Sequence, residues 1–394
     1  MPQPRIAIVG AGPAGLTLGV LLHAHDIPFT IFELRQKPTA EESSQPSGML
    51  DLHEGSGLAA IRECGLYDQF LKHTGDCAET QKVADKDGTI LYSNDDDSGH
   101  RPEIARHALL AILTTPLPEA SIKWGCKLLA ATSTETETET ELDFGPHGKH
   151  AFDLVIGADG AWSRVRGLLT DLRPHYAGTQ SVTLTIHNIT TRYPRLAALI
   201  GRGSFWALGR RHGVITQRGP RDSARVYVFL TAGDERVAGV SKEELLGDDA
   251  LLGRFGADVQ ELVAVACDET AGGPGGAVDV KPLYMLPVGA AWEHKAGVTL
   301  VGDAAHLMCP WAGEGVNLAM WDALLLARVI VQAWGAGRDV VRFQAALDPL
   351  LRRFEEDMVV RAREKAEETY SNGQMMFGED GANALAGFFL SVAQ

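Results

Sequence analysis

The stretch that decides the fold is Gly10-Ala11-Gly12-Pro13-Ala14-Gly15, a glycine-rich turn near the start of the chain. The short apolar run of residues 5–9 precedes it, a helical pattern runs from Gly15 to His25, and a second apolar run follows at 28–32. A strand, a glycine turn, a helix and a second strand within about thirty residues form the βαβ unit of a parallel sheet. The sequence therefore predicts an α/β fold from its first segment.

This turn also has the residue types that bind a dinucleotide. Gly10 permits a tight turn, Gly12 lets backbone N–H groups approach a pyrophosphate, and Gly15 lets the helix pack closely on the strand. Glu33 follows Gly15 by 18 residues, at the end of the second strand, where its carboxylate can accept hydrogen bonds from ribose hydroxyls. We assign Gly10, Gly12, Pro13, Ala14, Gly15 and Glu33 to a nucleotide cofactor. On its own, this segment leaves FAD and NAD(P) both open.

Two further strand-and-turn segments narrow the choice of nucleotide. Residues 153–160 read Asp-Leu-Val-Ile-Gly-Ala-Asp-Gly, an apolar strand that ends in a glycine turn. Residues 297–306 read Gly-Val-Thr-Leu-Val-Gly-Asp-Ala-Ala-His, another strand and turn, and an apolar helix starts near Val316. A single nucleotide fingerprint needs only the first segment. Three such segments fit a ligand that is contacted at its adenosine, pyrophosphate, ribityl chain and ring, which predicts FAD.

Composition and charge argue against several other classes of function. Lys and Arg total 36 against 51 Asp and Glu, a net charge of −15, which disfavours a general nucleic-acid or anionic-membrane binder. No stretch reaches about 18 uninterrupted apolar residues, so no membrane span is expected. The five cysteines are scattered without a CxxC pair, which predicts free thiols in a reducing compartment. We expect a cytoplasmic protein without a metal site, as a monomer or weak dimer.

Changes of pattern along the 394 residues predict two domains joined by a helix. Residues 81–93 alternate around Asp87-Gly88, a hairpin signal, and 178–231 are strand-rich without βαβ rhythm, which predicts an inserted antiparallel sheet. Residues 339–370 are charged and helical. The predicted parts are an FAD-binding domain (1–80, 94–178 and 277–338), a substrate-binding domain (81–93 and 179–276), a bridging helix (339–372) and a C-terminal segment (373–394).

The three motifs together resemble a known family. The order GxGxxG, GADGxxSxxR and GDAAHxxxPxxGxGxN is similar to that of the flavin-dependent aromatic hydroxylases of the para-hydroxybenzoate hydroxylase type, over nearly the whole chain. Within that group, residues 48–57 (GMLDLHEGSG) and 102–106 (PEIAR) look most like the tetracycline-inactivating monooxygenases. The resemblance implies a Rossmann-like FAD-binding domain with an inserted, mainly antiparallel substrate domain and a long C-terminal bracing helix.

The resemblance also implies where each motif contacts FAD. Glu33 falls on the adenosine ribose with Arg35 as the nearby positive charge, and Arg106 falls near the pyrophosphate or ribityl chain. Asp303 falls on the ribityl side, and Asp159 belongs to a motif associated with both FAD and the nicotinamide donor. The remaining cofactor residues are Gly48, Met49, Leu50 and Asp51 at the flavin edge, Gly302 in the third turn, and Pro310, Gly313, Gly315, Val316 and Asn317 beside the isoalloxazine.

Candidate substrate residues lie on the inserted sheet and beside the third motif. Gln217 aligns loosely with a substrate-contacting position of the family, and Trp311 and Ala312 would form the pocket wall. The pair Phe205-Trp206 is either sheet core or a shelf for the substrate. His306, within the third motif, favours a structural role over acid–base chemistry.

The reaction implied by the resemblance is oxygen insertion driven by the cofactor. NADPH or NADH reduces the flavin, O2 adds at its C4a carbon, and one oxygen atom is transferred to an electron-rich phenol or enol. The expected substrate is a tetracycline or a similar polycyclic polyketide, and no protein side chain is assigned a catalytic role. Two alternatives stay open: a flavin-dependent oxidase or reductase on the same fold, and a non-catalytic flavoprotein that sequesters an aromatic ligand.

Overall fold

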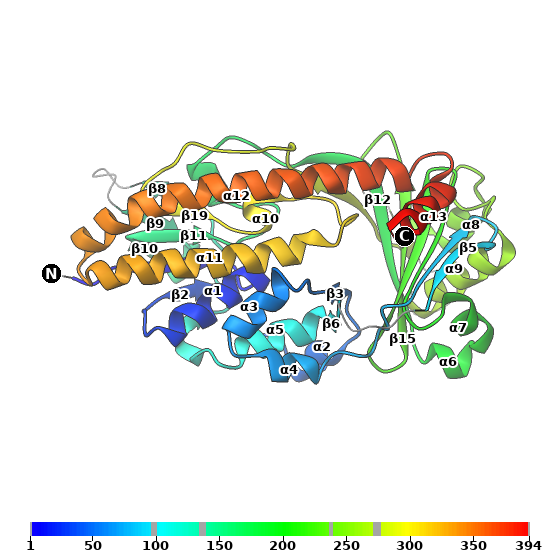
Figure 1. The fold of residues 1–394 in the computed structure, drawn as a ribbon, viewed down its shortest axis with the longest axis horizontal. Coiled ribbons are helices and arrows are strands. Elements are labelled where there is room, and N and C mark those ends of the chain that lie inside the picture. Colours follow the sequence, from blue (N-terminus) through cyan, green and yellow to red (C-terminus); the bar gives the residue numbers. More distant parts are fainter. Residues whose placement is uncertain (1, 96–100, 134–138, 236–238, 271–276, 393–394) are drawn as a thin grey trace.

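The structure is a computed structural model that describes residues 2–95, 101–133, 139–235, 239–270 and 277–392. It has two halves, each built around a β-sheet, and a long helix that runs along both (Figure 1). The first half contains a parallel five-stranded sheet in the order β19-β11-β1-β2-β7. Its strands are β1 (Ile6–Val9), β2 (Thr30–Phe32), β7 (Ile122–Lys123), β11 (Leu154–Gly157) and β19 (Val298–Leu300). The predicted βαβ unit and parallel sheet are confirmed.

Some helices that pack together beside this sheet are far apart in the sequence. The helix of the first motif, α1 (Pro13–Ala24), packs against α11 (Glu314–Ala336), which follows the third motif. α11 in turn packs against α12 (Val340–Met376). The remaining helices of this half are α2 (Ala40–Ser44), α3 (Gly57–Glu63), α4 (Tyr67–Leu71), α5 (Arg106–Thr114) and the short α10 (Asp303–His306).

The helix α11 is apolar because it lies in the core. Its most apolar 18-residue window has a mean hydropathy of 1.4, so by length and composition alone it could cross a membrane. However, 61% of that window is buried, between α1 and α12. A helix that is hydrophobic over most of its surface is expected where both of its sides are covered by protein.

Two smaller sheets extend the first half. β8 (Ala130–Ser133), β9 (Thr140–Asp143) and β10 (Lys149–Phe152) form an antiparallel sheet. β3 (Met49–Asp51) pairs with β6 (Glu103–Ala105) in a two-stranded antiparallel ribbon. We call this pair the β3–β6 ribbon. It lies where the first half meets the second (Figure 1).

The second half is built on a seven-stranded, mainly antiparallel sheet in the order β18-β12-β15-β14-β13-β4-β5. The strands are β4 (Gln81–Asp85), β5 (Ile90–Asn94), β12 (His175–Ile186), β13 (Ser204–Gly209), β14 (His212–Gly219), β15 (Ser223–Thr231) and β18 (Val280–Met285). Its outer face packs against helices in one hydrophobic core. These are α6 (Ile189–Arg192), α7 (Pro194–Ile200), α8 (Lys242–Gly247) and α9 (Ala257–Thr270), with β16 (Val240–Ser241) and β17 (Ala277–Val278) beside them.

The boundaries predicted for the inserted sheet need two corrections. β12 begins at His175 rather than at residue 179, and β18 belongs to this sheet although 277–338 was predicted to belong to the FAD-binding part. Both changes have one cause, because β18 pairs antiparallel with β12 from Met285 opposite His175 to Val280 opposite Val182. The pairing satisfies backbone groups that a shorter insertion would leave without partners.

The predicted bracing helix is confirmed as α12, which reaches from the first half to the inner face of the seven-stranded sheet (Figure 1). It continues to Met376, beyond the predicted end at residue 372, and contains Pro349. The predicted C-terminal segment then forms α13 (Gly381–Val392). α13 covers β13, β4 and β5, where Phe389 packs against Trp206 with 5.8 Å between ring centroids.

A buried charge cluster joins three of these helices. His306 of α10 contacts Asp322 of α11, with 2.5 Å between Nε2 and Oδ2. Arg361 of α12 lies 3.5 Å from the other oxygen of Asp322, which is 0% exposed. Burial opposes protonation of His306, but Asp322 outweighs it, so the pKa of His306 is raised. The structural role expected for His306 agrees with this position.

We expect Asp322→Ala to lower the free energy of unfolding by about 3–5 kcal/mol, because it leaves the buried His306 and the partly buried Arg361 without their carboxylate. The control is Asp357→Ala on α12, whose 3.9 Å ion pair with Arg353 is exposed and should contribute only about 0–1 kcal/mol. Denaturant unfolding followed by tryptophan fluorescence measures both variants. Equal losses would show that the buried cluster does not stabilise the junction of the three helices.

Candidate functional site

The three motif turns meet at one edge of the parallel sheet. The strands that precede them, β1, β11 and β19, are neighbours, and all run in the same direction. Backbone hydrogen bonds join the turns: Gly10 N donates to Phe32 O, Ala158 N to Val9 O, and Val301 N to Gly157 O, each at 2.8–2.9 Å. In open α/β sheets ligands bind at this carboxyl edge.

The first turn has the close approaches that require glycine. Gly10 has φ +110°, and a Cβ there would lie 2.2 Å from the carbonyl oxygen of Ala158. A Cβ on Gly15 would lie 2.0 Å from the oxygen of Gly10, whereas one on Gly12 would meet nothing within 4 Å. Gly12 precedes α1, so the open space lies at the N-terminus of a helix, where N–H groups attract phosphate. This geometry fits a pyrophosphate.

Glu33 lies at the end of β2 and is 7% exposed. Its two carboxylate oxygens accept hydrogen bonds from Ala11 N at 2.7 Å and from Arg35 N at 2.9 Å. An ionised carboxylate offers about four acceptor sites, so Glu33 can also accept ribose hydroxyls. The side chain of Arg35 is exposed at the same end of the strand.

The second motif ends in a carboxylate that is only half satisfied. Asp159 Oδ2 accepts hydrogen bonds from Arg164 N at 2.8 Å and Val165 N at 3.4 Å, and burial raises the pKa of this carboxyl. Its buried Oδ1 has no hydrogen-bond partner among the described residues. Such an orphaned acceptor fits a hydroxyl or N–H donor supplied by a ligand. Arg166, which is 4% exposed, connects this motif to the third through Nη1 and the oxygen of Ala304, 2.9 Å apart.

Asp303 and Arg106 lie near each other beside the third turn. Asp303 is the first residue of α10, after Gly302 with φ +62°. It is open to solvent on one side but surrounded by protein, and this loss of solvation raises its pKa while His306 and Arg106 act in the opposite direction. Arg106 is exposed at the start of α5, and its backbone N donates to Gly48 O at 3.0 Å. A carboxylate and a guanidinium that lie near each other fit the ribityl and pyrophosphate groups assigned to them.

Three of the residues predicted at the flavin edge form a strand. Residues 49–51 pair with 103–105, so the β3–β6 ribbon fixes them in an extended conformation. Gly48 precedes the strand, and a Cβ there would lie 2.8 Å from the hydroxyl of Tyr227 on β15. Gly313, with φ +67°, also approaches the ribbon, and its Cβ would lie 3.1 Å from Asp51 Oδ1. The ribbon therefore contacts both the third-motif loop and the seven-stranded sheet.

Asn317 has a different role from the predicted contact with the isoalloxazine ring. Its side chain is fully buried, and its Nδ2 donates to Asp51 O at 2.9 Å and to Gly313 O at 3.1 Å. Its Oδ1 accepts from the backbone N of His53 at 2.8 Å and from Ser56 Oγ at 3.4 Å. The Asn317 amide therefore makes its hydrogen bonds within the protein, and these bonds hold the segment after β3 against the start of α11. Pro310, Gly315 and Val316 lie in the same loop and first helical turn and stay accessible.

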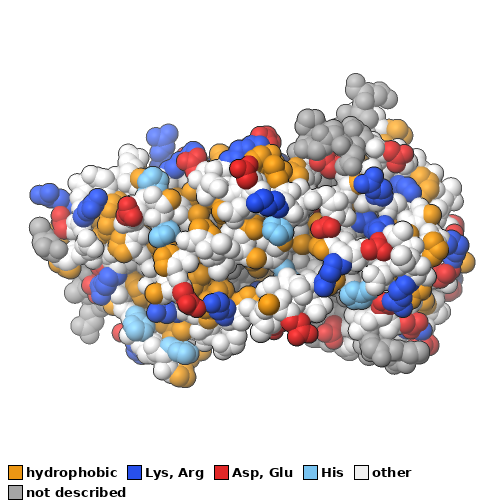
Figure 2. Space-filling view, turned by 90° about the horizontal axis from the view of Figure 1, so that it is seen from below, with side chains coloured by type: hydrophobic (Ala, Val, Ile, Leu, Met, Phe, Trp, Pro, Cys, Tyr) orange, Lys and Arg blue, Asp and Glu red, His pale blue; other side chains and the backbone are white. Residues whose placement is uncertain are grey.

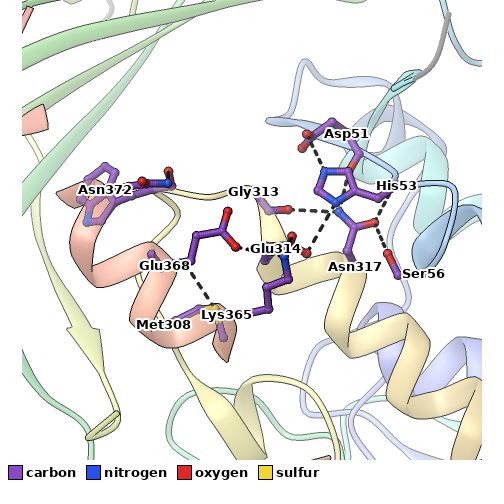
Figure 3. A network of polar contacts seen from close by, with 12 residues as sticks. Asp51, His53, Ser56, Met308, Gly313, Glu314, Asn317, Lys365, Glu368 and Asn372 are labelled. Carbon is purple, nitrogen blue, oxygen red and sulfur yellow. Dashed lines mark hydrogen bonds and ion pairs between the residues drawn. The ribbon is translucent and has the colours of Figure 1, made fainter. Parts of the chain in front are cut away.

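A chain of charged groups runs from the β3–β6 ribbon to α12 (Figure 3). His53 lies between Asp51, 3.1 Å from Nε2, and Glu314, 3.5 Å from Nδ1. Burial lowers the pKa of His53, but the two carboxylates outweigh it and raise this pKa to about 9. Lys365 of α12 then pairs with Glu314 at 2.6 Å and with Glu368 at 3.0 Å.

The structure separates the predicted substrate residues. Gln217 faces the β3–β6 ribbon, with Nε2 3.4 Å from Glu103 Oε2. Trp311 lies in an aromatic cluster, 4.7 Å from both Phe229 and Phe377 by ring centroids, and Ala312 is half-buried beside it.

The proposal that Phe205 is a substrate shelf is wrong. Phe205 is 0% exposed and lies in the core between the sheet and its outer helices, because side chains alternate along a strand. Trp206 points to the inner face, where Phe389 of α13 packs against it.

Several residues of the site were not assigned from the sequence. His53 and Glu103 lie inside the two segments, 48–57 and 102–106, that carried the closer resemblance, so a signal was present there. Arg225 on β15 and Lys365 on α12 lie far along the chain without a local motif. Only their position in the fold brings them to the site.

Comparisons with known proteins agree with this geometry. A family model described as an FAD binding domain matches residues 4–250 and 286–340. The chain is 37% identical to the monooxygenase penA of Penicillium thymicola, over 97% of each chain. It is 33% identical to the monooxygenase asqM of Emericella nidulans, over 98% of each.

Solved structures share the fold at lower identity. Klebsiella pneumoniae HpxO complexed with FAD and uric acid has a TM-score of 0.75 at 19% identity, covering 99% of this chain and 92% of that one. The tetracycline destructase Tet(51) has a TM-score of 0.62 at 19% identity, covering 95% and 97%. The likeness to Tet(51) extends to the fold alone. Together with the family model and the two monooxygenases, these findings show that the chain belongs to the FAD-dependent monooxygenases of the aromatic hydroxylase family.

Proposed function

We propose that this monooxygenase uses NADPH or NADH to insert one oxygen atom of O2 into an electron-rich phenol or enol of flat, polycyclic shape. The observation that carries the proposal is the position of the β3–β6 ribbon. It contacts the third-motif loop through Asp51 and Gly313, and it contacts the inner face of the sheet through Glu103 and Gln217. Ligand sites occur preferentially at such domain interfaces.

FAD, when bound, supplies the activation of O2 with electrons from the nicotinamide donor. The protein holds it through the glycine turn at 10–15, the Glu33 carboxylate, and the facing pair Arg106 and Asp303. The side chains around the ribbon then bind the substrate, orient it and exclude water.

Arg225 favours a substrate with an acidic oxygen. It lies opposite Gln217 on the neighbouring strand, half-buried, and its Nη1 donates to Thr185 Oγ1. No carboxylate pairs with it among the described residues, and its buried Nε has no hydrogen-bond partner there. A half-buried cation without a counter-charge favours binding of an anionic oxygen, such as a phenolate or enolate.

Tetracycline, the substrate expected from the resemblance, is one member of this class of substrates. We further propose a cytoplasmic monomer or weak dimer that acts on small molecules, without a nucleic-acid or membrane partner. Acidic and basic side chains are interspersed over the face in Figure 2, and the net charge of −15 supports this view.

The purified protein should release FAD on denaturation, and Asp303→Ala should weaken its retention. Loss of a hydrogen bond to a charged group typically costs about 1.5–3 kcal/mol, so the Kd for FAD should rise roughly 10–150-fold. Flavin fluorescence titration of apoprotein measures the change, with Asp258→Ala on the outer helix α9 as control. Release of FMN, or an unchanged Kd in Asp303→Ala, would contradict these roles.

Arg225→Gln should raise KM for phenolic substrates about tenfold or more, without loss of FAD. The assay is NADPH and NADH oxidation across polyphenols, anthraquinones and tetracyclines under ¹⁸O2, with Arg195→Gln on the outer surface as control. We expect one ¹⁸O atom per product molecule and NAD(P)H consumption matched to substrate. Hydrogen peroxide without labelled product would identify an oxidase, and an absence of substrate-stimulated oxidation would identify a binding protein.

A further inference from the structure

We infer that Glu103 is the general base that removes the proton from the ionisable hydroxyl of the substrate, and so converts a phenol or enol into its reactive anion. The inference deepens the proposed function and rests on it. Glu103 comes from β6, whose neighbour Arg106 serves the cofactor. None of the assigned cofactor contacts involves the Glu103 carboxyl group.

Glu103 faces the contact between the two halves of the protein. In the β3–β6 ribbon it lies directly opposite Asp51, and side chains of cross-strand partners emerge on the same face. Met49 lies on this face too, 3.9 Å from where a Cβ on Gly219 of β14 would be. Glu103 itself is 8% exposed, and Gln217 Nε2 donates to its Oε2 at 3.4 Å. Its carboxyl group is therefore directed at the inner face of the substrate sheet.

The two carboxyl groups of the ribbon have different surroundings. Asp51 has cationic partners, Arg101 at 2.9 Å and His53 at 3.1 Å. Glu103 forms no ion pair among the described residues, and Gln217, which donates to it, is a neutral amide. An amide N–H can donate to a carboxyl oxygen in either protonation state, so Gln217 holds Glu103 in place whether or not it carries a proton.

The charges around Glu103 tune it to accept a proton near neutral pH. Burial raises the pKa of Glu103 to about 8, with Asp51 and Glu79 adding to the rise and Cys77 and Arg101 opposing it. Arg225 is the cation one strand beyond Gln217. A base works best when its pKa lies near the working pH.

The proposed step moves one proton and no electrons between molecules. The O–H bond of the substrate breaks, its proton forms a new O–H bond on the Glu103 carboxylate, and the electron pair stays on the substrate oxygen. Delocalisation of that pair raises electron density at the ring carbon that is oxygenated. Arg225 stabilises the oxyanion, and the proton on Glu103 is released to solvent or returned to the product.

This role predicts a pH dependence with a definite sign. Only ionised Glu103 can accept the proton, so at pH 7 roughly one carboxylate in ten is competent. kcat/KM should rise with pH and level off above about 8. Glu103→Gln should lower kcat/KM by about 10²–10⁴-fold and remove this rise, and the loss should shrink for more acidic phenols, which ionise without help. Glu103→Asp should restore part of the rate together with the pH-dependent rise.

The test uses FAD-loaded protein in two measurements. Infrared difference spectra between pH 6 and 10 should show a protonated carboxyl band that disappears with a midpoint near 8 in wild type and that is lost in Glu103→Gln. Steady-state kinetics with tetracycline and 1,8-dihydroxyanthraquinone, both of which carry ionisable hydroxyls, give the pH profiles. The matched control is Glu355→Gln, a buried glutamate bonded to His294 outside the site, which should leave the band and both profiles unchanged.

The outcomes separate this inference from the proposed function. The role of Glu103 is overturned if the wild type lacks the band. It is also overturned if Glu103→Gln, at normal FAD content, has the same pH profile of oxygenation as the wild type. The proposed function is overturned instead if the wild type shows the band but oxygenates neither of these two compounds nor any other compound of the wider panel. Full FAD content and an unchanged circular dichroism spectrum in Glu103→Gln exclude misfolding as the cause of a lost rate.

Discussion

The rest of the structure depends on the parallel pairing of β19, β11, β1 and β2. Because parallel strands present their carboxyl ends at one edge, turns that lie far apart in the sequence meet there. The pairing brings Asp159 and Asp303 beside the first glycine turn and places Glu33 next to it. Such close approach excludes side chains, since a Cβ on Gly10 would lie 2.2 Å from Ala158 O. One backbone arrangement therefore creates the surface to which an extended dinucleotide can bind.

Contacts between segments far apart in the sequence hold the third-motif loop in place. Asn317 at the start of α11 forms hydrogen bonds to the segment after β3, and Lys365 of α12 pairs with Glu314 of the third-motif loop. Trp311 of that loop packs against aromatic side chains of the sheet and the end of α12. These contacts make the loop beside the predicted flavin position a shared element of both halves.

The acids of the site share one physical property. Desolvation raises the pKa of Asp159, Asp303 and Glu103, and none of the three forms an ion pair within 4.0 Å among the described residues. Acceptors of this kind are best satisfied by neutral donors such as hydroxyl groups. Asp51 differs, because it forms ion pairs with Arg101 and His53. The site therefore combines acceptors suited to a hydroxyl-rich cofactor with a cation, Arg225, suited to an acidic substrate.

The sequence by itself determined the βαβ unit, the three motif turns, the family and the existence of an inserted sheet, because these depend on local periodicity and on glycines at fixed spacing. Only the tertiary structure decided which face of each strand is functional. Phe205 and Trp206 are adjacent in sequence, yet one is core and the other faces inward. It also decided that β18 joins the inserted sheet, and that Glu103 meets Gln217. Pairing and long-range packing set these contacts, and neither leaves a local pattern in the chain.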